Sequence, residues 1–300
     1  MDTSQAAPIE ANFDLLFSEP SDRPPRKMLV SFIDPADVVG GASLPSQGSR
    51  RGVISMVPEG VGFARIKPTR NGSARFKTTM PDFASFTKGY SLIPANPGQG
   101  KLAGYEVAAN PYGKNGGSVS GRAEVGYDGA LAADSILADL DWARKPAADM
   151  RRRHPGFLQG FNIAALLQGF TYSKPSAGIP IGFNTNPIGP NATLTLRGGN
   201  LPESPLSYPI TIHDGRGEQS GPPDTASAPS QLGLKLKFTF SQGVFIGSFV
   251  HPRSGNRIKF IGGISSLERR CRGLFLSPEF LDSFGKNKNT GRVEITPRAP

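Results

Sequence analysis

Glycine and proline together make up more than a fifth of the 300 residues, with 37 glycines and 28 prolines. Glycine tolerates left-handed backbone conformations, and proline lacks the amide hydrogen that a helix or a sheet ladder needs. A chain this rich in both is a poor candidate for a helical protein, and the composition favours short strands joined by many turns. We therefore expect an all-β protein with little helix.

The clearest strand signal is the segment LKLKFTFS at 234–241. Apolar and polar side chains alternate along it, which is typical of a strand with one face in solvent. Gln242-Gly243 then predicts a turn, and the returning segment VFIGSFV places Phe245, Gly247 and Phe249 on one face. The glycine leaves room there for a neighbouring ring or a closely approaching backbone.

The same pattern occurs earlier in the chain. When Asn71-Gly72 is aligned with Gln242-Gly243, Pro81 falls opposite Pro252 without a gap, and Met80 falls opposite His251. Both copies then close on similar tails, GKNGGSVSGRAEV and GKNKNTGRVEI. The shared Gly-Lys-Asn, Gly-Arg and Glu positions indicate an internal repeat.

Length and apolar content predict two domains of ordinary size. We expect a disordered N-terminal arm at 1–27, a first β domain at 28–150 and a second at 151–300, which repeats the first. The boundary falls in an Arg-, Ala- and Pro-rich linker at about 143–155. The low-complexity segment near 217–231 predicts a mobile loop in the second domain.

The segment before that linker fits two structures. Asp134 or Ser135 is suited to cap a helix through Leu140, whereas Ile136 and Trp142 belong to an alternation typical of a strand. The β-rich surroundings and the following Pro146 favour the strand.

Lys and Arg total 34 against 24 Asp and Glu, which gives a formal net charge of +10. Because the charge is spread along the chain, it fits either a solvated basic surface or a partner that is a polyanion, such as an acidic glycan or a nucleic acid. The candidate anion-binding residues lie in arginine clusters, whose planar groups suit bidentate contacts. Arg50-Arg51 is one further arginine dipeptide. The arginines near residue 270, in a predicted turn and at a strand edge, would also discourage edge-to-edge aggregation. The candidates are Arg151, Arg152, Arg153, Arg269, Arg270 and Arg272.

Catalytic signals are weak. Of the three histidines, His154 follows three arginines, His213 precedes Asp214 in a turn-like segment, and His251 stands opposite a methionine. Asp139 and Asp141 would share a strand face, either as a carboxylate pair for glycoside chemistry or as a solvated face. Turn and surface roles account for all of these residues, so we predict no enzyme and no catalytic, cofactor-binding or metal-binding residue. A hydrolase that uses His213 with Asp214, or Asp139 with Asp141, is the competing hypothesis.

Other motifs add little. A single cysteine, Cys271, excludes an intramolecular disulfide and a cysteine metal cluster, and we expect it to be half-buried on a strand. The segment GSVSG lacks the central serine of a hydrolase elbow, and the chain has no phosphate-binding loop of the Walker type. Residues 1–27 show no signal-peptide pattern, and no apolar run is long enough to predict a membrane span.

Six segments carry a resemblance to a known family. In order they are GVGFARIKPTRNGSARF, DLDWARKP, HPGFLQGFNIAALLQGFTYSKP, LTLRGGNL, GVFIGSFVHPRSGNRIKFIGGI and NTGRVEI. This set resembles the paired β-rich modules near the C-terminal ends of large, repeat-containing exported or surface proteins of planctomycete and verrucomicrobial bacteria. The chain departs from that family at RCRG, where a strand glycine is replaced, and in lacking the family's signal and upstream repeats.

The resemblance implies two small twisted antiparallel barrels or sandwiches in tandem, with no catalytic residues to transfer. It also implies an exported or cell-surface location, with other domains of a larger surface assembly as partners. We therefore expect a non-catalytic structural or attachment module. The alternative is a module that binds acidic polysaccharide or nucleic acid through basic surface patches.

Overall fold

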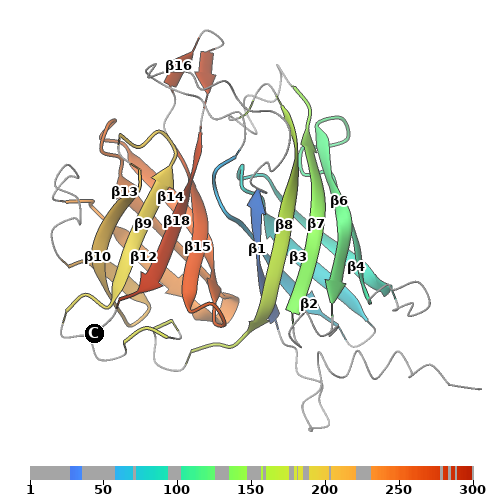
Figure 1. Ribbon diagram of the computed structural model, residues 1–300, viewed down its shortest axis with the longest axis horizontal. Coiled ribbons are helices and arrows are strands. Elements are labelled where there is room, and N and C mark those ends of the chain that lie inside the picture. Colours follow the sequence, from blue (N-terminus) through green and yellow to red (C-terminus); the bar gives the residue numbers. More distant parts are fainter. Residues whose placement is uncertain are drawn as a thin grey trace, which may run out of the picture.

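The computed structural model shows two closed β barrels that stand side by side (Figure 1). This arrangement confirms the all-β prediction and the tandem barrels. A 3-10 turn at Phe240–Gln242 interrupts the strands. The structure describes residues 28–35, 58–69, 72–93, 103–125, 135–146, 157, 160–175, 179–180, 182–184, 189–202, 204–220, 231–277, 280–282, 285–287 and 289–298.

The first barrel is an antiparallel meander in which each strand pairs with the next and the last pairs back to the first. Its strands are β1 (Met28–Pro35), β2 (Gly62–Pro68), β3 (Ser73–Thr79), β4 (Ser85–Ile93), β5 (Gly104–Ala109), β6 (Gly117–Val125), β7 (Ser135–Arg144) and β8 (Phe161–Tyr172).

The second barrel closes through a pairing between its first strand in the chain and its last. A small hairpin, β16 (Phe280–Asp282) with β17 (Gly285–Asn287), leaves the barrel between β15 and β18 (Figure 1). The barrel strands are β9 (Ala192–Gly198), β10 (Leu206–His213), β11 (Arg216–Gln219), β12 (Lys235–Thr239), β13 (Val244–Val250), β14 (Arg257–Ser265), β15 (Arg270–Leu276) and β18 (Thr290–Pro297).

The predicted boundary at 150/151 is wrong. The first barrel closes only when β8 pairs with both β1 and β7, so it extends to Tyr172. The expected strand at 135–144 is confirmed as β7, which reaches into the predicted linker. The first residues of the mobile loop expected near 217–231 belong to β11, which continues to Gln219, and residues 221–230 lie outside the described residues. The predicted arm at 1–27 lies outside the described residues.

The repeat covers five neighbouring strands in each barrel. The aligned segments form β2 to β6 in the first barrel, and β12, β13, β14, β15 and β18 in the second. Three more strands complete each ring, and they come from different parts of the chain. The first barrel takes β1 from before the repeat and β7 and β8 from after it, whereas the second takes β9, β10 and β11 from before it. The two rings therefore have the same neighbour order but start at different points of the cycle.

Aromatic rings fill the interior of the second barrel. Phe249 packs edge-on against Phe275 with ring centroids 5.1 Å apart, and Phe260 lies 6.0 Å from Phe245. Gly247 faces Phe260, and a Cβ atom on this glycine would lie 2.2 Å from that ring. The sequence pattern of rings and glycines is thus scaffolding, in which the missing side chains at Gly247 and Gly262 make room for Phe260 and Phe245.

The barrels meet along β1, whose two faces are both buried. Ile33 faces the interior of the first barrel, while Val30 and Phe32 pack into the apolar cluster of the second. Gly243 and Gly263 permit this approach, since a Cβ atom on them would lie 2.7 and 3.0 Å from methyl groups of Val30. Backbone hydrogen bonding and side chains from other strands extend the same contact. The Val61 amide donates to the Gly273 carbonyl at 3.3 Å, and the Tyr172 hydroxyl donates to the Phe240 carbonyl at 2.8 Å.

We expect Gly247→Val to destabilise the protein by about 2 kcal/mol, because the added methyl groups would collide with Phe260 in a closely packed interior. The measurement is the denaturant midpoint of unfolding. Gly89→Val is the matched control, since Gly89 also lies on a strand but a Cβ atom there meets nothing within 4 Å. Equal effects of the two substitutions would contradict this account of Gly247.

Candidate functional site

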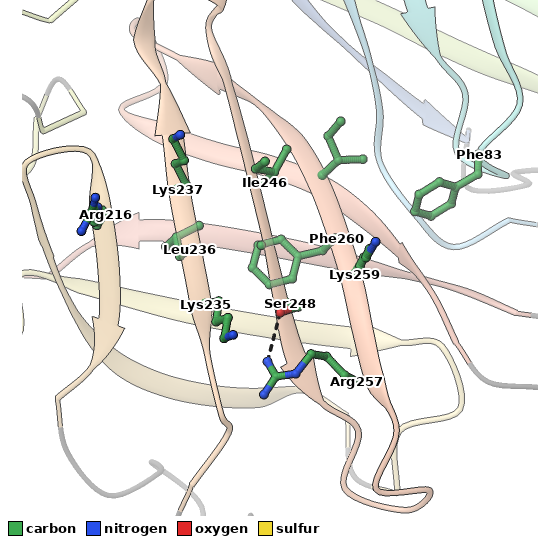
Figure 2. Close-up of a pocket in the computed structure, with 12 residues that line it drawn as sticks. Phe83, Arg216, Lys235, Leu236, Lys237, Ile246, Ser248, Arg257, Lys259 and Phe260 are labelled. Carbon is green, nitrogen blue, oxygen red and sulfur yellow. Dashed lines mark hydrogen bonds between the residues drawn. The ribbon is translucent and has the colours of Figure 1, made fainter.

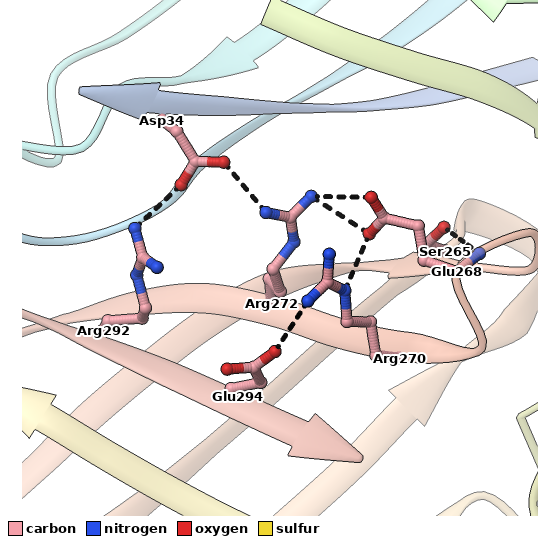
Figure 3. Close-up of polar contacts among 7 residues, drawn as sticks. All are labelled: Asp34, Ser265, Glu268, Arg270, Arg272, Arg292 and Glu294. Atoms are coloured by element: carbon pink, nitrogen blue, oxygen red, sulfur yellow. Dashed lines mark hydrogen bonds and ion pairs between the residues drawn. The ribbon is translucent and has the colours of Figure 1, made fainter. Parts of the chain in front are cut away.

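The arginines at 270 and 272 form an ion-pair network at the junction of the barrels (Figure 3). Arg272 donates to Asp34 of β1 at 2.9 Å and to Glu268 at 3.0 Å. Its guanidinium carbon also lies 4.3 Å from the centroid of the Phe32 ring, a cation–π geometry. Arg292 donates to the second oxygen of Asp34 at 2.9 Å. A single carboxylate of the first barrel therefore holds two strands of the second.

Arg270 completes the network within the second barrel. It donates to Glu268 at 3.0 Å and to Glu294 at 3.3 Å. The Glu268 hydrogen bond is the main reason that the pKa of Arg270 is raised. Carboxylates already neutralise both arginines. In place of the predicted anion-binding role, we therefore assign Arg272 a role at the junction and Arg270 a structural role within the second barrel. Of the other candidates, Arg269 is exposed in a turn, and Arg151, Arg152 and Arg153 lie outside the described residues.

The candidate catalytic residues do not come together into a site. The side chain of His213 is 54% exposed, and its ring nitrogens lie 3.8 Å from Asp214 and 3.9 Å from Glu218. Asp139 and Asp141 are exposed on β7. This is the arrangement of a hairpin turn and of a solvated strand face. His154 lies outside the described residues.

His251 and Cys271 are both fully buried. His251 begins the β13–β14 turn, where its amide donates to the Asn256 carbonyl at 2.9 Å; Met80 begins the β3–β4 turn in the same way, donating to Ala84 at 2.7 Å. Burial lowers the pKa of His251, and a contact to the Gly199 carbonyl, which raises the pKa, offsets only part of this effect. Cys271 was expected to be half-buried, but it points into the barrel, and burial raises the pKa of its thiol.

A buried polar cluster at the end of the first barrel was missed by the sequence reasoning. The Tyr112 hydroxyl donates to Asp82 at 2.7 Å and accepts from the Trp142 indole at 2.8 Å, while Arg144 lies 3.4 Å from Asp82. Burial raises the pKa of Tyr112. The members come from three separate segments, so no local motif announces them. Their mutual satisfaction indicates a structural closure of the barrel end.

The sequence reasoning also missed a basic array on the outside of the first barrel. Arg65 and Lys67 of β2 stand opposite Lys77 and Arg75 of β3 in the strand register. We call these four residues the first basic face. They line a pocket of about 370 Å³ with Thr87 and Gln242.

Among the residues that the structure describes, no carboxylate forms an ion pair with the first basic face. The strands β2, β3 and β4 contain no Asp or Glu, and among the described residues none of the four cations forms an ion pair. Arg65 donates to Gln242 of the second barrel, and burial lowers its pKa. Like charges directly opposite one another destabilise a sheet. The four cations lie opposite one another despite this repulsion and form no ion pair with a described residue. Such an array is suited to an anionic ligand.

The second barrel carries a related surface at the equivalent strands. In the gap-free alignment Arg75 corresponds to Ile246 and Lys77 to Ser248, and their cross-strand partners on β12 are Lys237 and Lys235. Arg216, Arg257 and Lys259 add three cations around this region. We call the residues on the outer side of β11 to β14 the second basic face: Arg216, Lys235, Lys237, Ile246, Ser248, Arg257, Lys259 and Ile261.

The comparisons with known proteins leave function open. No protein-family model matches the chain, and no curated protein matches it. The chain is similar to a crystal structure of a protein of unknown function from the DUF3598 family of Nostoc punctiforme, at 10% identity and a TM-score of 0.22, covering 91% of this chain and 96% of that one. The fold described above therefore rests on the strand pairing alone.

Among the described residues, no cluster of three or more His, Cys, Asp or Glu side chains is placed to hold a metal ion. In the same part of the chain, no helix is long and apolar enough to cross a bilayer.

We expect Asp34→Asn to destabilise the protein by about 1 to 3 kcal/mol, since it leaves the largely buried Arg272 without one of its carboxylates. Hydrogen exchange should rise at β1 and β14, where the barrels meet. Glu106→Gln is the control, because the Glu106 side chain is 58% exposed and an ion pair at such a position contributes about 0.5 kcal/mol or less. An unchanged denaturant midpoint for Asp34→Asn would refute the junction role.

We expect the buried His251 to make the free energy of unfolding decrease in acid. Its folded pKa lies below the ordinary value of 6.5, so the unfolded state binds the proton more tightly. This contribution is complete above about pH 6.5 and is lost as the pH falls below that value. We expect His251→Met, which copies the equivalent Met80, to make the midpoint temperature of thermal unfolding less dependent on pH between pH 7 and pH 5. A wild-type slope in His251→Met would contradict the assignment.

Proposed function

We propose that this chain is a non-catalytic attachment module that binds an acidic polysaccharide through its first basic face. The observation that carries the proposal is the array of Arg65, Lys67, Arg75 and Lys77, four outward cations on paired strands that form no ion pair with any described carboxylate. The resemblance to modules of bacterial exported and surface proteins supports a role outside the cell, as one part of a larger surface assembly.

The geometry of the array fits a repeating anionic polymer. Neighbouring residues across two strands lie about 5 Å apart and alternate residues along one strand about 7 Å apart, so the four charges form a small grid. A grid of this size contacts several successive acidic groups of one polymer, and each such contact releases counterions. The ion-pair network at Asp34 joins the barrels and supports a fixed surface for attachment.

Acidic polysaccharide is favoured over nucleic acid by the side chains that line the pocket. Proteins that bind single strands stack bases on aromatic rings, which provide much of the affinity. The pocket at the first basic face is lined by basic, threonine and glutamine side chains, with no aromatic ring among its lining residues. Charge contacts of this kind suit carboxylate or sulfate groups on a flexible sugar chain.

The test is binding of fluorescently labelled heparin and alginate fragments, compared with a DNA oligonucleotide, at about 0.15 M salt. We expect Arg75→Gln/Lys77→Gln to weaken polysaccharide binding at least about tenfold, or about 1.4 kcal/mol, and to reduce its salt dependence. Lys145→Gln/Lys174→Gln is the control, because it removes the same charge from exposed positions elsewhere.

Equal losses in both double variants would show that net charge alone attracts the polymer, and would overturn the site. Tighter binding of DNA than of either polysaccharide would replace the proposed ligand. Turnover of a polysaccharide by the wild-type chain that is lost in Asp139→Asn would refute the non-catalytic assignment.

A further inference from the structure

The second basic face differs from the first in one respect, because it contains an apolar strip. Ile246 of β13 is 45% exposed and stands directly opposite Ile261 of β14. Lys237 lies on the other side of Ile246, and Arg216 lies opposite Lys237. One row across four strands therefore reads cation, cation, isoleucine, isoleucine.

The adjacent row is polar. Lys235 stands opposite Ser248, and Ser248 stands opposite Lys259. Arg257 donates to the Ser248 hydroxyl at 3.1 Å and to the Gly233 carbonyl at 2.9 Å, which fixes its guanidinium beside this row (Figure 2). Lys235 and Lys259 form no ion pair among the described residues. The apolar strip thus lies beside charges that no local carboxylate neutralises.

A residue of the first barrel lies near the apolar strip formed by Ile246 and Ile261. Phe83, in the β3–β4 turn, reaches toward β14 and lines the same pocket (Figure 2). Its backbone is left-handed, with φ at 69°, a conformation that costs a non-glycine residue energy and often marks a functional position. The Phe83 amide donates to the Met80 carbonyl at 2.9 Å, which holds the turn. The pocket has a volume of about 600 Å³, a size typical of small-molecule sites.

We propose that this pocket binds an amphiphilic anion, in which a phosphate, sulfate or carboxylate head is joined to an alkyl or aryl body. The body lies along Ile246, Ile261 and Phe83, where it removes apolar surface from water. The head lies beside Lys237 and Lys235, where it accepts charge-assisted hydrogen bonds. This site is separate from the polysaccharide site, and the inference goes beyond the proposed function.

The equivalent position in the first barrel explains the difference in ligand. Arg75 occupies the place of Ile246, so the first basic face is charged where the second is apolar. Lys77 likewise occupies the place of Ser248. One scaffold therefore presents a site for a polymer of charges on one barrel and a site for a head and an apolar body on the other.

The experiment is isothermal titration calorimetry of the full chain with n-octyl phosphate below its micelle concentration. We expect saturable binding at least about tenfold tighter than inorganic phosphate, because the alkyl chain removes apolar surface from water when it binds. Octanol should bind at least about tenfold more weakly than octyl phosphate, since it cannot use the lysines. Failure of either comparison overturns the proposal.

Variants locate the site and separate it from the first basic face. Ile246→Ser should weaken octyl phosphate at least about fivefold and leave inorganic phosphate unchanged, and Lys237→Gln should weaken both. Leu166→Ser is the matched control, because Leu166 is an exposed leucine on β8 of the other barrel. Wild-type affinity in Ile246→Ser overturns the site.

The double variant Arg75→Gln/Lys77→Gln should lose polysaccharide binding and retain octyl phosphate, so the two proposals fail independently. Vesicles that contain phosphatidic acid separate a free amphiphile from a bilayer. Competition between octyl phosphate and the vesicles supports the shared head-and-chain chemistry. Vesicle binding without octyl phosphate binding overturns the proposal in favour of a membrane surface.

Discussion

The structure depends on one strand, β1, that is buried on both faces. Its inward residue Ile33 belongs to the core of the first barrel, and its outward residues Val30 and Phe32 belong to the core of the second. A strand that is apolar on both sides has little reason to prefer one register, because a slip by one residue exchanges the faces. Asp34 removes that ambiguity. A slip would carry its carboxylate into the first barrel and away from Arg272, at the cost of a buried unpaired charge.

The junction also explains why the arginine cluster near residue 270 is a poor guide to ligand binding. On a strand, Arg270 and Arg272 share the outer face while Cys271 points into the core, so the pleat divides the contiguous motif. The two arginines share Glu268, which is near in the sequence, but their other carboxylate partners, Glu294 for Arg270 and Asp34 for Arg272, come from distant positions. The fold therefore uses these neighbouring guanidinium groups in structural ion pairs.

Much of the fold could be predicted from the sequence, since strand alternation and turn chemistry are local. The strand predicted at 234–241 is confirmed over Lys235–Thr239, although Phe240–Gln242 already belongs to the 3-10 turn, and the turn at Gly243 and the role of Gly247 are confirmed. The domain boundary was wrong because ring closure is not local. The repeat ends at β6, and nothing in the sequence of β8 shows that it must return to β1. The same limit applies to the Asp82 cluster, whose members meet only after the barrel closes.

The basic faces had a sequence signal that was interpreted too simply. Arg65 and Lys67, like Lys235 and Lys237, alternate with inward apolar residues, a pattern that also describes any solvated strand. What distinguishes them is a property of the sheet, namely which cations become cross-strand neighbours and whether a carboxylate is among them.

Inward positions of the two barrels are restricted by packing, because a ring and a facing glycine must change together. Outward positions carry no such restriction. Divergence after duplication is therefore expected on the outer faces of equivalent strands, and the exchange of Arg75 for Ile246 lies there.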